Sequence, residues 1–447
     1  MSGSRVVIVG GGLSGISAAL ACADAGVRVT LVEADPRLGG AASSFRRGGL
    51  KVDNGQHVFL RCCAAYRGLL DRLGTAGRTV LQDRLDIPVL SPGRRVERIR
   101  RTRLPAPLHL GPALGGYGYL SLAERARAAR CALALARLDP RDPALDARRF
   151  GEWLASQHQS RRAVETLWDL IALPALNLPA ADASLALAAK VFKTGLLEAP
   201  GAGDIGYAVS SLEEAHAAPA EEVLVAGGHA VHRRTRAHAI ERSGDELAVA
   251  ADRGRFEGDA VIVAVAHTAL PSIAGVAWPP VEGLGTSPIV NLHFVYDRHV
   301  AGVDFAAVLD SPLQWVFDRT RQSGLRQGQY LAVSLSAADE HAGTRTSRLR
   351  EIFEPEMARL FPGAAAARVT DFFVTREKEA TFRAAPGTAA LRPGPATGAP
   401  GVYLAGAWTG TGWPATMEGA VRSGISAARA ALIGLGRTRR LPKEVAA

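Results

Sequence analysis

The sequence first suggests chemistry at three glycines, Gly10, Gly12 and Gly15, which have the spacing Gly-x-Gly-x-x-Gly. In a strand–turn–helix unit, the first glycine forms the tight turn, the second lets a pyrophosphate approach the backbone, and the third lets the helix pack closely on the strand. Glu33 lies 18 residues after Gly15, where a carboxylate can accept a hydrogen bond from a ribose hydroxyl. The pattern therefore predicts a dinucleotide site.

The flanking residues predict the elements that must hold this turn. Residues 6–9 read Val-Val-Ile-Val, which is typical of a parallel strand that is buried on both faces. An alanine-rich run ending at Gly26 predicts a helix, and its first residues, Leu13 and Ser14, would present free N–H groups to a phosphate. Residues 27–33 predict a second parallel strand.

A further pattern follows the second predicted strand. Together with Glu33, the residues Arg37, Gly39 and Gly40 read E-x-x-x-R-x-G-G. This resembles the pattern that flavoproteins with two dinucleotide-binding domains place beside the diphosphate of FAD. A Rossmann domain that binds only a nicotinamide cofactor does not require this segment, so the resemblance implies that the cofactor is FAD.

Composition and charge limit the class of protein and its partners. The chain has 447 residues, of which 47% are hydrophobic and 21% are charged, as in an ordinary folded enzyme. The net charge of +10 favours an acidic partner. Because the sequence contains no nucleic-acid motif, we expect no nucleic-acid partner, and an anionic membrane surface is favoured instead.

The cysteines favour a reducing compartment. None of the four forms a Cys-x-x-Cys pair, and they are Cys22, Cys62, Cys63 and Cys131. The sequence therefore predicts neither a metal site nor a disulfide framework, which is typical of a cytoplasmic protein.

A basic segment is followed by an apolar one. Six arginines lie between Arg94 and Arg103, and the next twenty residues, 104–123, contain no Asp, Glu, Lys or Arg. Three prolines and four glycines in 104–123 exclude a membrane-spanning helix. The segment, with Tyr117 and Tyr119, could instead lie in the lipid interface at the inner face of the cell membrane and admit an apolar substrate. A basic hairpin followed by an ordinary core segment is the alternative.

A polar pentapeptide, Asp53-Asn54-Gly55-Gln56-His57, follows another predicted strand. At this distance from the glycine turn it resembles the squalene-associated FAD-dependent desaturases, a branch of the amine oxidase and phytoene desaturase superfamily. Residues 172–179, Ala-Leu-Pro-Ala-Leu-Asn-Leu-Pro, resemble the same group. The characterised activity of this group is the dehydroxylation of hydroxysqualene in squalene and hopanoid synthesis. The resemblance also implies that Gln56 contacts the FAD.

The C-terminal region carries a second part of the resemblance. Residues 402–409 predict a strand and a turn at Gly406, and a helix is expected to begin near Thr416. A helix N-terminus aimed at the pyrimidine edge of a flavin stabilises the negative charge of the reduced ring. The resemblance implies that Gly406, Ala407 and Met417 contact the FAD, although the family usually has an acidic residue where this chain has Ala407.

These patterns predict an α/β protein with a Rossmann-like FAD-binding domain of the GR2 flavoprotein type. A substrate domain of α+β type, with a helical insertion, is expected to be interleaved with it. The FAD-binding domain is expected to comprise 1–80, 221–270 and 396–435, and the substrate domain 81–220 and 271–395. Helices are expected over 120–138, 150–158, 160–172, 182–192 and 347–360, and strands of an antiparallel sheet over 289–296, 313–317, 330–334 and 369–375.

The residues that are absent narrow the chemistry. Amine oxidases of this superfamily place a lysine near flavin N5 in the strand that corresponds to 289–296, and this sequence has no lysine between Lys193 and Lys378. Amine oxidation is therefore disfavoured. Dehydroxylation of hydroxysqualene and desaturation of a carotenoid precursor remain, and both need an apolar cavity that excludes water. A prenyl-binding escort protein without catalysis is a third alternative.

Only dehydroxylation needs a proton donor for the departing oxygen, and we expect His57 to be this donor. Asp53 could orient the imidazole and raise its pKa, which would keep a proton available near neutral pH. Asn54, in the same turn, completes the expected catalytic set.

A second glycine triplet does not identify the electron donor. Gly201-x-Gly203-x-x-Gly206 has no strand before it, so we expect a loop. The sequence therefore gives no second site for NAD(P)H, and the electron donor stays unidentified.

Overall fold

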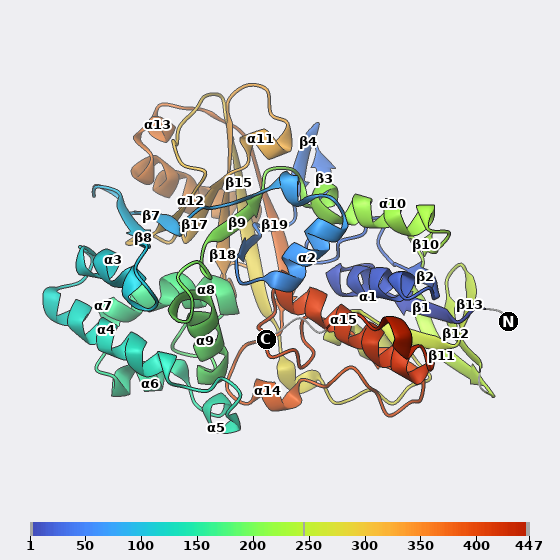
Figure 1. The fold of residues 1–447 in the computed structure, drawn as a ribbon. Helices are drawn as coiled ribbons and strands as arrows, with labels where there is room; N and C mark the ends of the chain where they lie inside the picture. Colours follow the sequence, from blue (N-terminus) through green and yellow to red (C-terminus); the bar gives the residue numbers. More distant parts are fainter. Residues whose placement is uncertain (1–2, 245, 444–447) are drawn as a thin grey trace.

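The computed structural model describes residues 3–244 and 246–443. Its first layer is a five-stranded parallel sheet with the strand order β10-β2-β1-β14-β20. The strands are β1 (Arg5–Val9), β2 (Arg28–Val32), β10 (Ala230–His232), β14 (Ala260–Val263) and β20 (Val402–Leu404). Figure 1 shows β1, β2 and β10 of this sheet. Strands β14 and β20 add segments from the middle and the end of the chain. The predicted Rossmann-like core is thereby confirmed.

Helices cover one face of the parallel sheet, and α1 and α15 lie side by side there (Figure 1). The helices of this region are α1 (Leu13–Asp24), α2 (Ala64–Arg72), α10 (Ala218–Ala226) and α15 (Met417–Gly434). At the crossing of α1 and α15, a methyl group on Gly424 would lie 2.1 Å from the carbonyl oxygen of Ser14. The two helices can therefore approach this closely only because position 424 has no side chain.

An antiparallel sheet covers the opposite face. It contains β11 (Ala237–Ser243), β12 (Glu246–Ala251) and β13 (Gly254–Gly258). Leu247 and Val249 of β12 are buried in the same core cluster as Val7 and Val9 of β1. Because β1 is covered on both sides, its side chains are apolar at every position from 6 to 9.

The second layer is a seven-stranded sheet with the order β19-β15-β18-β17-β16-β7-β8. Its strands are β7 (Asp86–Leu90), β8 (Glu97–Arg100), β15 (Ser287–Tyr296), β16 (Phe305–Val308), β17 (Trp315–Asp318), β18 (Gln329–Ser336) and β19 (Val369–Thr381). The antiparallel pairs β15–β18, β17–β18 and β15–β19 confirm the predicted sheet. The sequence did not predict β7, β8 and β16, since these strands are short and β8 has only one apolar residue, Ile99.

Helix α12 (Thr346–Leu360) packs on this sheet, as predicted. Leu349, Phe353 and Met357 of α12 are buried in one core cluster with Leu292 and Phe294 of β15. Strand side chains alternate between faces, so Asn291 and His293 of β15 lie on the face opposite α12. That polar face is turned to the segment that follows β4 (Leu50–Asp53), because Asn291 bonds to Asn54.

The predicted helical insertion lies beside the larger sheet (Figure 1). Its helices are α3 (Gly111–Gly115), α4 (Leu122–Ala136), α5 (Pro143–Asp146), α6 (Phe150–Ser156), α7 (Arg161–Ala163), α8 (Asp169–Leu176) and α9 (Leu185–Phe192). The helix expected over 160–172 is interrupted by a π-helical turn, Val164–Trp168, and further π-helical turns are Lys193–Leu197 and Glu213–Ala217. The remaining short helices are α11 (Thr320–Ser323), α13 (Pro362–Ala365) and α14 (Thr388–Leu391).

The expectation of a loop over 201–206 is only partly correct. Gly206 lies in β9 (Ile205–Ala208), which pairs with β5 (Val58–Leu60) and β6 (Thr79–Leu81). A methyl group on Gly206 would lie 2.4 Å from the ring of Phe59. Gly206 therefore leaves room for the ring of Phe59 in β5. Because β5 is far away in the sequence, local sequence does not reveal this need for a glycine.

The contact at Gly424 yields a stability prediction. Gly424→Ala forces α15 away from α1, so it should lower the free energy of unfolding by about 1–3 kcal/mol, as overpacking does. Urea unfolding followed by circular dichroism measures the effect. Gly68→Ala in α2 is the matched control, because a methyl group there meets no atom within 4 Å, and it should raise stability by up to about 1 kcal/mol. Equal effects at the two positions would contradict the close-contact account.

Candidate flavin-binding and active site

The glycine turn has the geometry that its spacing predicts. Gly10 has a φ of +104°, and a methyl group on Gly15 would lie 1.8 Å from the carbonyl oxygen of Gly10. Gly12 is the N-cap of α1, and no side chain of the described residues caps this helix. The first N–H groups of α1, beginning at Leu13, are therefore available to an anion such as a diphosphate.

Glu33 lies over the same turn. One carboxylate oxygen accepts a hydrogen bond from Gly11 N at 2.5 Å, and the other accepts from Asp35 N at 2.7 Å. Each oxygen retains a second acceptor position. The half-buried carboxylate can therefore hold the turn and still accept from a ribose hydroxyl.

The segment after β2 packs directly on the glycine turn. Gly39 N donates to Gly11 O at 2.8 Å, and a methyl group on Gly40 would lie 3.0 Å from the Cα of Gly12. Arg37 is exposed and forms an ion pair with Asp35 at 3.4 Å. The structure therefore brings the two predicted glycine patterns together at one point.

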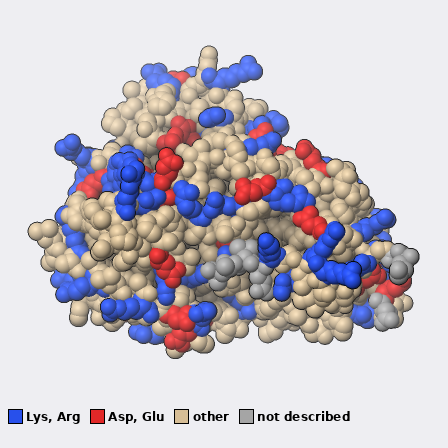
Figure 2. All heavy atoms as spheres, in the orientation of Figure 1, with Lys and Arg blue, Asp and Glu red and all other residues tan. Residues whose placement is uncertain are grey.

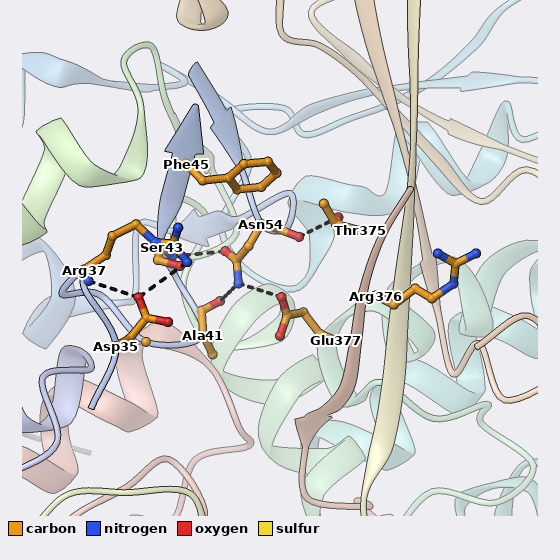
Figure 3. Close-up of a pocket in the computed structure, with 10 residues that line it drawn as sticks. Asp35, Arg37, Ala41, Ser43, Phe45, Asn54, Thr375, Arg376 and Glu377 are labelled. Atoms are coloured by element: carbon orange, nitrogen blue, oxygen red, sulfur yellow. Dashed lines mark hydrogen bonds and ion pairs between the residues drawn. The ribbon is translucent and has the colours of Figure 1, made fainter. Parts of the chain in front are cut away.

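A cavity of about 440 Å³ opens beside this point (Figure 3). It lies between the 35–45 segment, Asn54 and β19. The lining residues are Asp35, Arg37, Gly40, Ala41, Ser43, Phe45, Asn54, Thr375, Arg376 and Glu377. Arg37 and Gly40 thus belong both to the expected cofactor residues and to the wall of this cavity.

The C-terminal pattern reaches the same region. Gly406 N donates to Ser423 Oγ at 2.9 Å, and Ser423 Oγ lies within hydrogen-bonding distance of Ser14 Oγ, at 3.1 Å. Helix α15 begins at Met417, where the hydroxyl of the N-cap residue, Thr416, accepts from Gly419 N at 3.2 Å. Helix α15 is therefore linked to Gly406 and to the N-terminus of α1 through two serines.

Sequence reasoning missed Arg392, which fixes the loop after Gly406. Its Nη2 donates to the carbonyl oxygens of Ala407, Thr409 and Trp413 at 3.2, 2.6 and 2.7 Å. Burial lowers the pKa of this guanidinium to about 10. A lone charged residue in the Pro/Gly-rich stretch before β20 was the available signal.

Several buried polar atoms test whether these residues fit a flavin. The side-chain N and O of Gln56, Oδ1 of Asn291 and Nε1 of Trp413 have no hydrogen-bond partner in the described part of the chain. These atoms come from the Asp53–His57 turn, from β15 and from the loop before α15. Buried polar groups are normally paired, so the set fits a polar ligand between these segments, as does the uncapped turn of α1.

Both polar atoms of the Asn54 side chain have hydrogen-bond partners. Its Oδ1 accepts from Ser43 N at 3.0 Å, and its Nδ2 donates to Ala41 O at 3.0 Å and to Glu377 Oε1 at 3.1 Å (Figure 3). Since both amide hydrogens are used, the contacts favour a role in positioning the turn over a role in the reaction.

The expected pairing of Asp53 with His57 is wrong. Asp53 Oδ1 accepts from Ser44 Oγ at 2.7 Å and from Leu212 N at 3.0 Å, and Oδ2 forms an ion pair with Arg319. Arg319 is a cation from a distant segment, and no local pattern indicates that it pairs with Asp53.

His57 is held in a different way. Its Nδ1 lies 3.1 Å from Gly55 O, so the backbone orients the imidazole instead of Asp53. Burial lowers the pKa of His57 below its usual value of 6.5, and the opposing effect of Asp53 is smaller. The expected rise in this pKa is therefore also wrong.

Comparison with known proteins agrees with this geometry. The chain matches the flavin-containing amine oxidoreductase family over residues 13–432. It therefore belongs to this family. The protein is an FAD-dependent oxidoreductase.

Individual proteins that are similar to this chain are more specific than the family as a whole. The chain is 28% identical to a hydroxysqualene dehydroxylase of Sinorhizobium fredii, over 96% of this chain and 98% of the relative. It is 25% identical to a zeta-carotene desaturase of Zea mays, over 94% of this chain and 82% of the relative. Cyclohexylamine oxidase from Brevibacterium oxydans has the same fold, with a TM-score of 0.73 and 17% identity over 97% of this chain and 100% of that chain.

The Asp53–Arg319 ion pair yields a second stability prediction. The side chains are only 4% and 10% exposed, so Arg319→Met leaves a buried carboxylate without its cation. It should lower the free energy of unfolding by about 3–5 kcal/mol. Arg298→Met is the control, because its pair with Asp297 is at the surface and should cost at most about 1 kcal/mol. Denaturant unfolding that gives equal losses would contradict the account.

Proposed function

We propose that this protein catalyses the reductive dehydroxylation of hydroxysqualene to squalene. The observation that carries the proposal is the similarity to a hydroxysqualene dehydroxylase along nearly the whole of both chains. When bound and reduced, FAD supplies the hydride. The hydroxyl group leaves as water, so the reaction also requires one proton from the protein.

The proposed FAD site combines the three regions around the glycine turn. Free N–H groups of α1 would bind the diphosphate, Glu33 would accept from the ribose, and the N-terminus of α15 would face the flavin ring. The proposed contacts are Gly10, Gly12, Leu13, Ser14, Gly15, Glu33, Arg37, Gly39, Gly40, Gln56, Gly406, Ala407 and Met417. The proposed FAD-binding domain comprises 1–80, 221–270 and 396–435, and the proposed substrate domain comprises 81–220 and 271–395.

The proposed substrate is a long apolar isoprenoid, held between the larger sheet and the helical insertion. The insertion supplies many apolar residues to the core, including Phe150, Trp153 and Trp168. Exclusion of water protects the cation that forms when the hydroxyl leaves. Within this site, the Asp53–Arg319 pair and the amide of Asn54 act as positioning groups for the turn that carries His57.

His57 is the proposed proton donor. Its lowered pKa makes it a stronger acid, but only a small fraction is protonated at neutral pH. The rate of a single turnover should therefore rise as the pH falls from 8, and it should level off below the folded-state pKa, which is under 6.5.

The pH dependence gives a direct prediction for His57. In His57→Gln, the single-turnover rate should fall at least tenfold and lose the rise toward low pH, because the titrating donor is gone. Rapid quenching of photoreduced protein with hydroxysqualene at several pH values measures this. An unchanged profile in His57→Gln would assign the proton to another group.

Contact with a lipid surface is the second part of the proposal. No helix among residues 3–244 and 246–443 has the length and apolarity required to cross a bilayer. Tyr117 and Tyr119 are buried, so the expectation that they lie in the lipid interface is wrong. Leu108 and Leu122, in contrast, are 61% and 78% exposed. They lie in two segments that each contact α3, which in turn contacts β8.

Basic residues accompany these leucines. Figure 2 shows Lys and Arg side chains over much of the visible face, with a group over the β7–β8 hairpin. The exposed arginines of this hairpin region are Arg94, Arg95, Arg98, Arg100 and Arg103. Apolar side chains beside basic ones favour peripheral binding to an anionic membrane, on the cytoplasmic side in this proposal.

Vesicle binding tests this surface. The double variant Leu108→Ser with Leu122→Ser should bind vesicles of anionic phospholipid at least about tenfold more weakly, because each buried leucine contributes about 1.5–3 kcal/mol. Ile433→Ser, which changes an exposed residue of α15, is the control and should bind as the unmodified protein does. Sedimentation with vesicles measures the partition. Equal binding of all three proteins would contradict the proposal.

Product analysis tests the proposed reaction itself. Anaerobic, photoreduced protein is incubated with hydroxysqualene, and oxidised protein with phytoene, because the zeta-carotene desaturase similarity keeps desaturation as the second candidate. Photoreduction replaces the unidentified electron donor. Squalene detected by mass spectrometry supports dehydroxylation, and a desaturated product from phytoene supports the alternative. A purified protein without bound flavin and without either product would favour a prenyl-binding escort role.

A further inference from the structure

A buried amide on β15 is only half satisfied. Asn291 is 0% exposed, and its Nδ2 donates to the main-chain oxygen of Asn54 at 3.2 Å. Its Oδ1 is buried and has no hydrogen-bond partner within the described ranges. Buried polar groups are normally paired, so this oxygen requires a donor that the described residues do not supply.

The contact with Asn54 fixes which way the amide points. A main-chain carbonyl oxygen can only accept, so the nitrogen of Asn291 must face it, and a flipped amide would set two oxygens against each other. Thr375 Oγ1 donates to the same carbonyl at 2.9 Å. The orientation of the Asn291 amide is therefore fixed. Its Oδ1 points away from Asn54 O and can accept a hydrogen bond.

A second unsatisfied amide lies near the contact between Asn291 and Asn54, and the next polar side chain on this face of β15 is satisfied. Gln56, two residues after Asn54, also has a buried amide without partners in the described chain. His293, on the same face of β15, has both ring nitrogens occupied by Tyr330 Oη and Thr375 Oγ1, at 2.7 and 3.1 Å. On this face of β15 the side chain at 293 is therefore fully paired, and the unpartnered acceptor is at 291, beside the turn that includes Gln56.

We propose that Oδ1 of Asn291 accepts a hydrogen bond from an N–H or O–H donor at the reacting centre. Two groups could donate this hydrogen bond. One is the N5–H of reduced FAD, which the oxidised cofactor lacks. The other is the hydroxyl group of the substrate, and this second source rests on the proposed function.

The midpoint potential of bound FAD tests the first source. If N5–H is the donor, the hydrogen bond stabilises only the reduced cofactor, so Asn291→Leu should shift the oxidised-to-reduced equilibrium at least tenfold toward the oxidised form. That shift corresponds to about 30 mV for a two-electron couple. Gln322→Leu is the matched control, because Gln322 also donates to a main-chain oxygen and has a buried, unpartnered Oε1. It should leave the potential unchanged.

Ligand affinity tests the second source. If the hydroxyl group is the donor, the unmodified protein should bind hydroxysqualene at least tenfold more tightly than squalene, and Asn291→Leu should lose this preference while the potential stays the same. Equilibrium binding to oxidised protein, followed by the flavin spectrum, measures the ratio. This binding requires no turnover, so a protein that binds with the preference but makes no squalene would contradict the proposed function and not the role of Asn291.

A conservative variant guards against a purely structural effect. In Asn291→Asp the protonated carboxyl group can donate to Asn54 O and retain an accepting oxygen, so it should restore whichever property Asn291→Leu loses. If Asn291→Leu folds, as judged by thermal unfolding, and changes neither the potential nor the binding ratio relative to Gln322→Leu, the proposal is overturned. Failure of Asn291→Asp to restore the lost property would overturn it as well.

Discussion

The close approach of backbone at a few glycines is the constraint on which the site depends. Gly424 lets α15 touch α1, Gly15 lets α1 touch the turn at Gly10, and Gly40 lets the segment after β2 touch Gly12. These contacts join residues from both ends of the chain without side chains between them. The cofactor site proposed for this region exists only because the joined backbone leaves N–H groups and polar atoms facing one space.

Local sequence was sufficient to predict the elements around the glycine turn. The run at 6–9, the glycine spacing and the run ending at Gly26 predicted β1, the turn and α1, because strand burial and helix entry each have a short-range signature. The family resemblance added the second glycine pattern and the turn at Gly406. The strands β7, β8 and β16 were not predicted, because their stability comes from neighbours in the larger sheet.

The proposed active-site residues show which contacts local sequence does not reveal. Asp53 and His57 looked like a pair because they are close in sequence, but Arg319 reaches the carboxylate from another part of the chain. Burial lowers the pKa of His57 more than Asp53 raises it. Partners that come from distant segments, such as Arg319, Arg392 and Asn291, depend on tertiary structure that no local pattern encodes.

The central claim is that hydride passes from the bound flavin to an isoprenoid carbon as its hydroxyl group leaves. Photoreduction of the FAD-loaded protein in D2O places deuterium at the exchangeable N5 position, and anaerobic addition of hydroxysqualene then allows one turnover. The account predicts squalene that carries one deuterium by mass spectrometry, with reoxidation of the flavin. Squalene without deuterium, or hydroxysqualene unchanged beside a flavin that stays reduced, would contradict it.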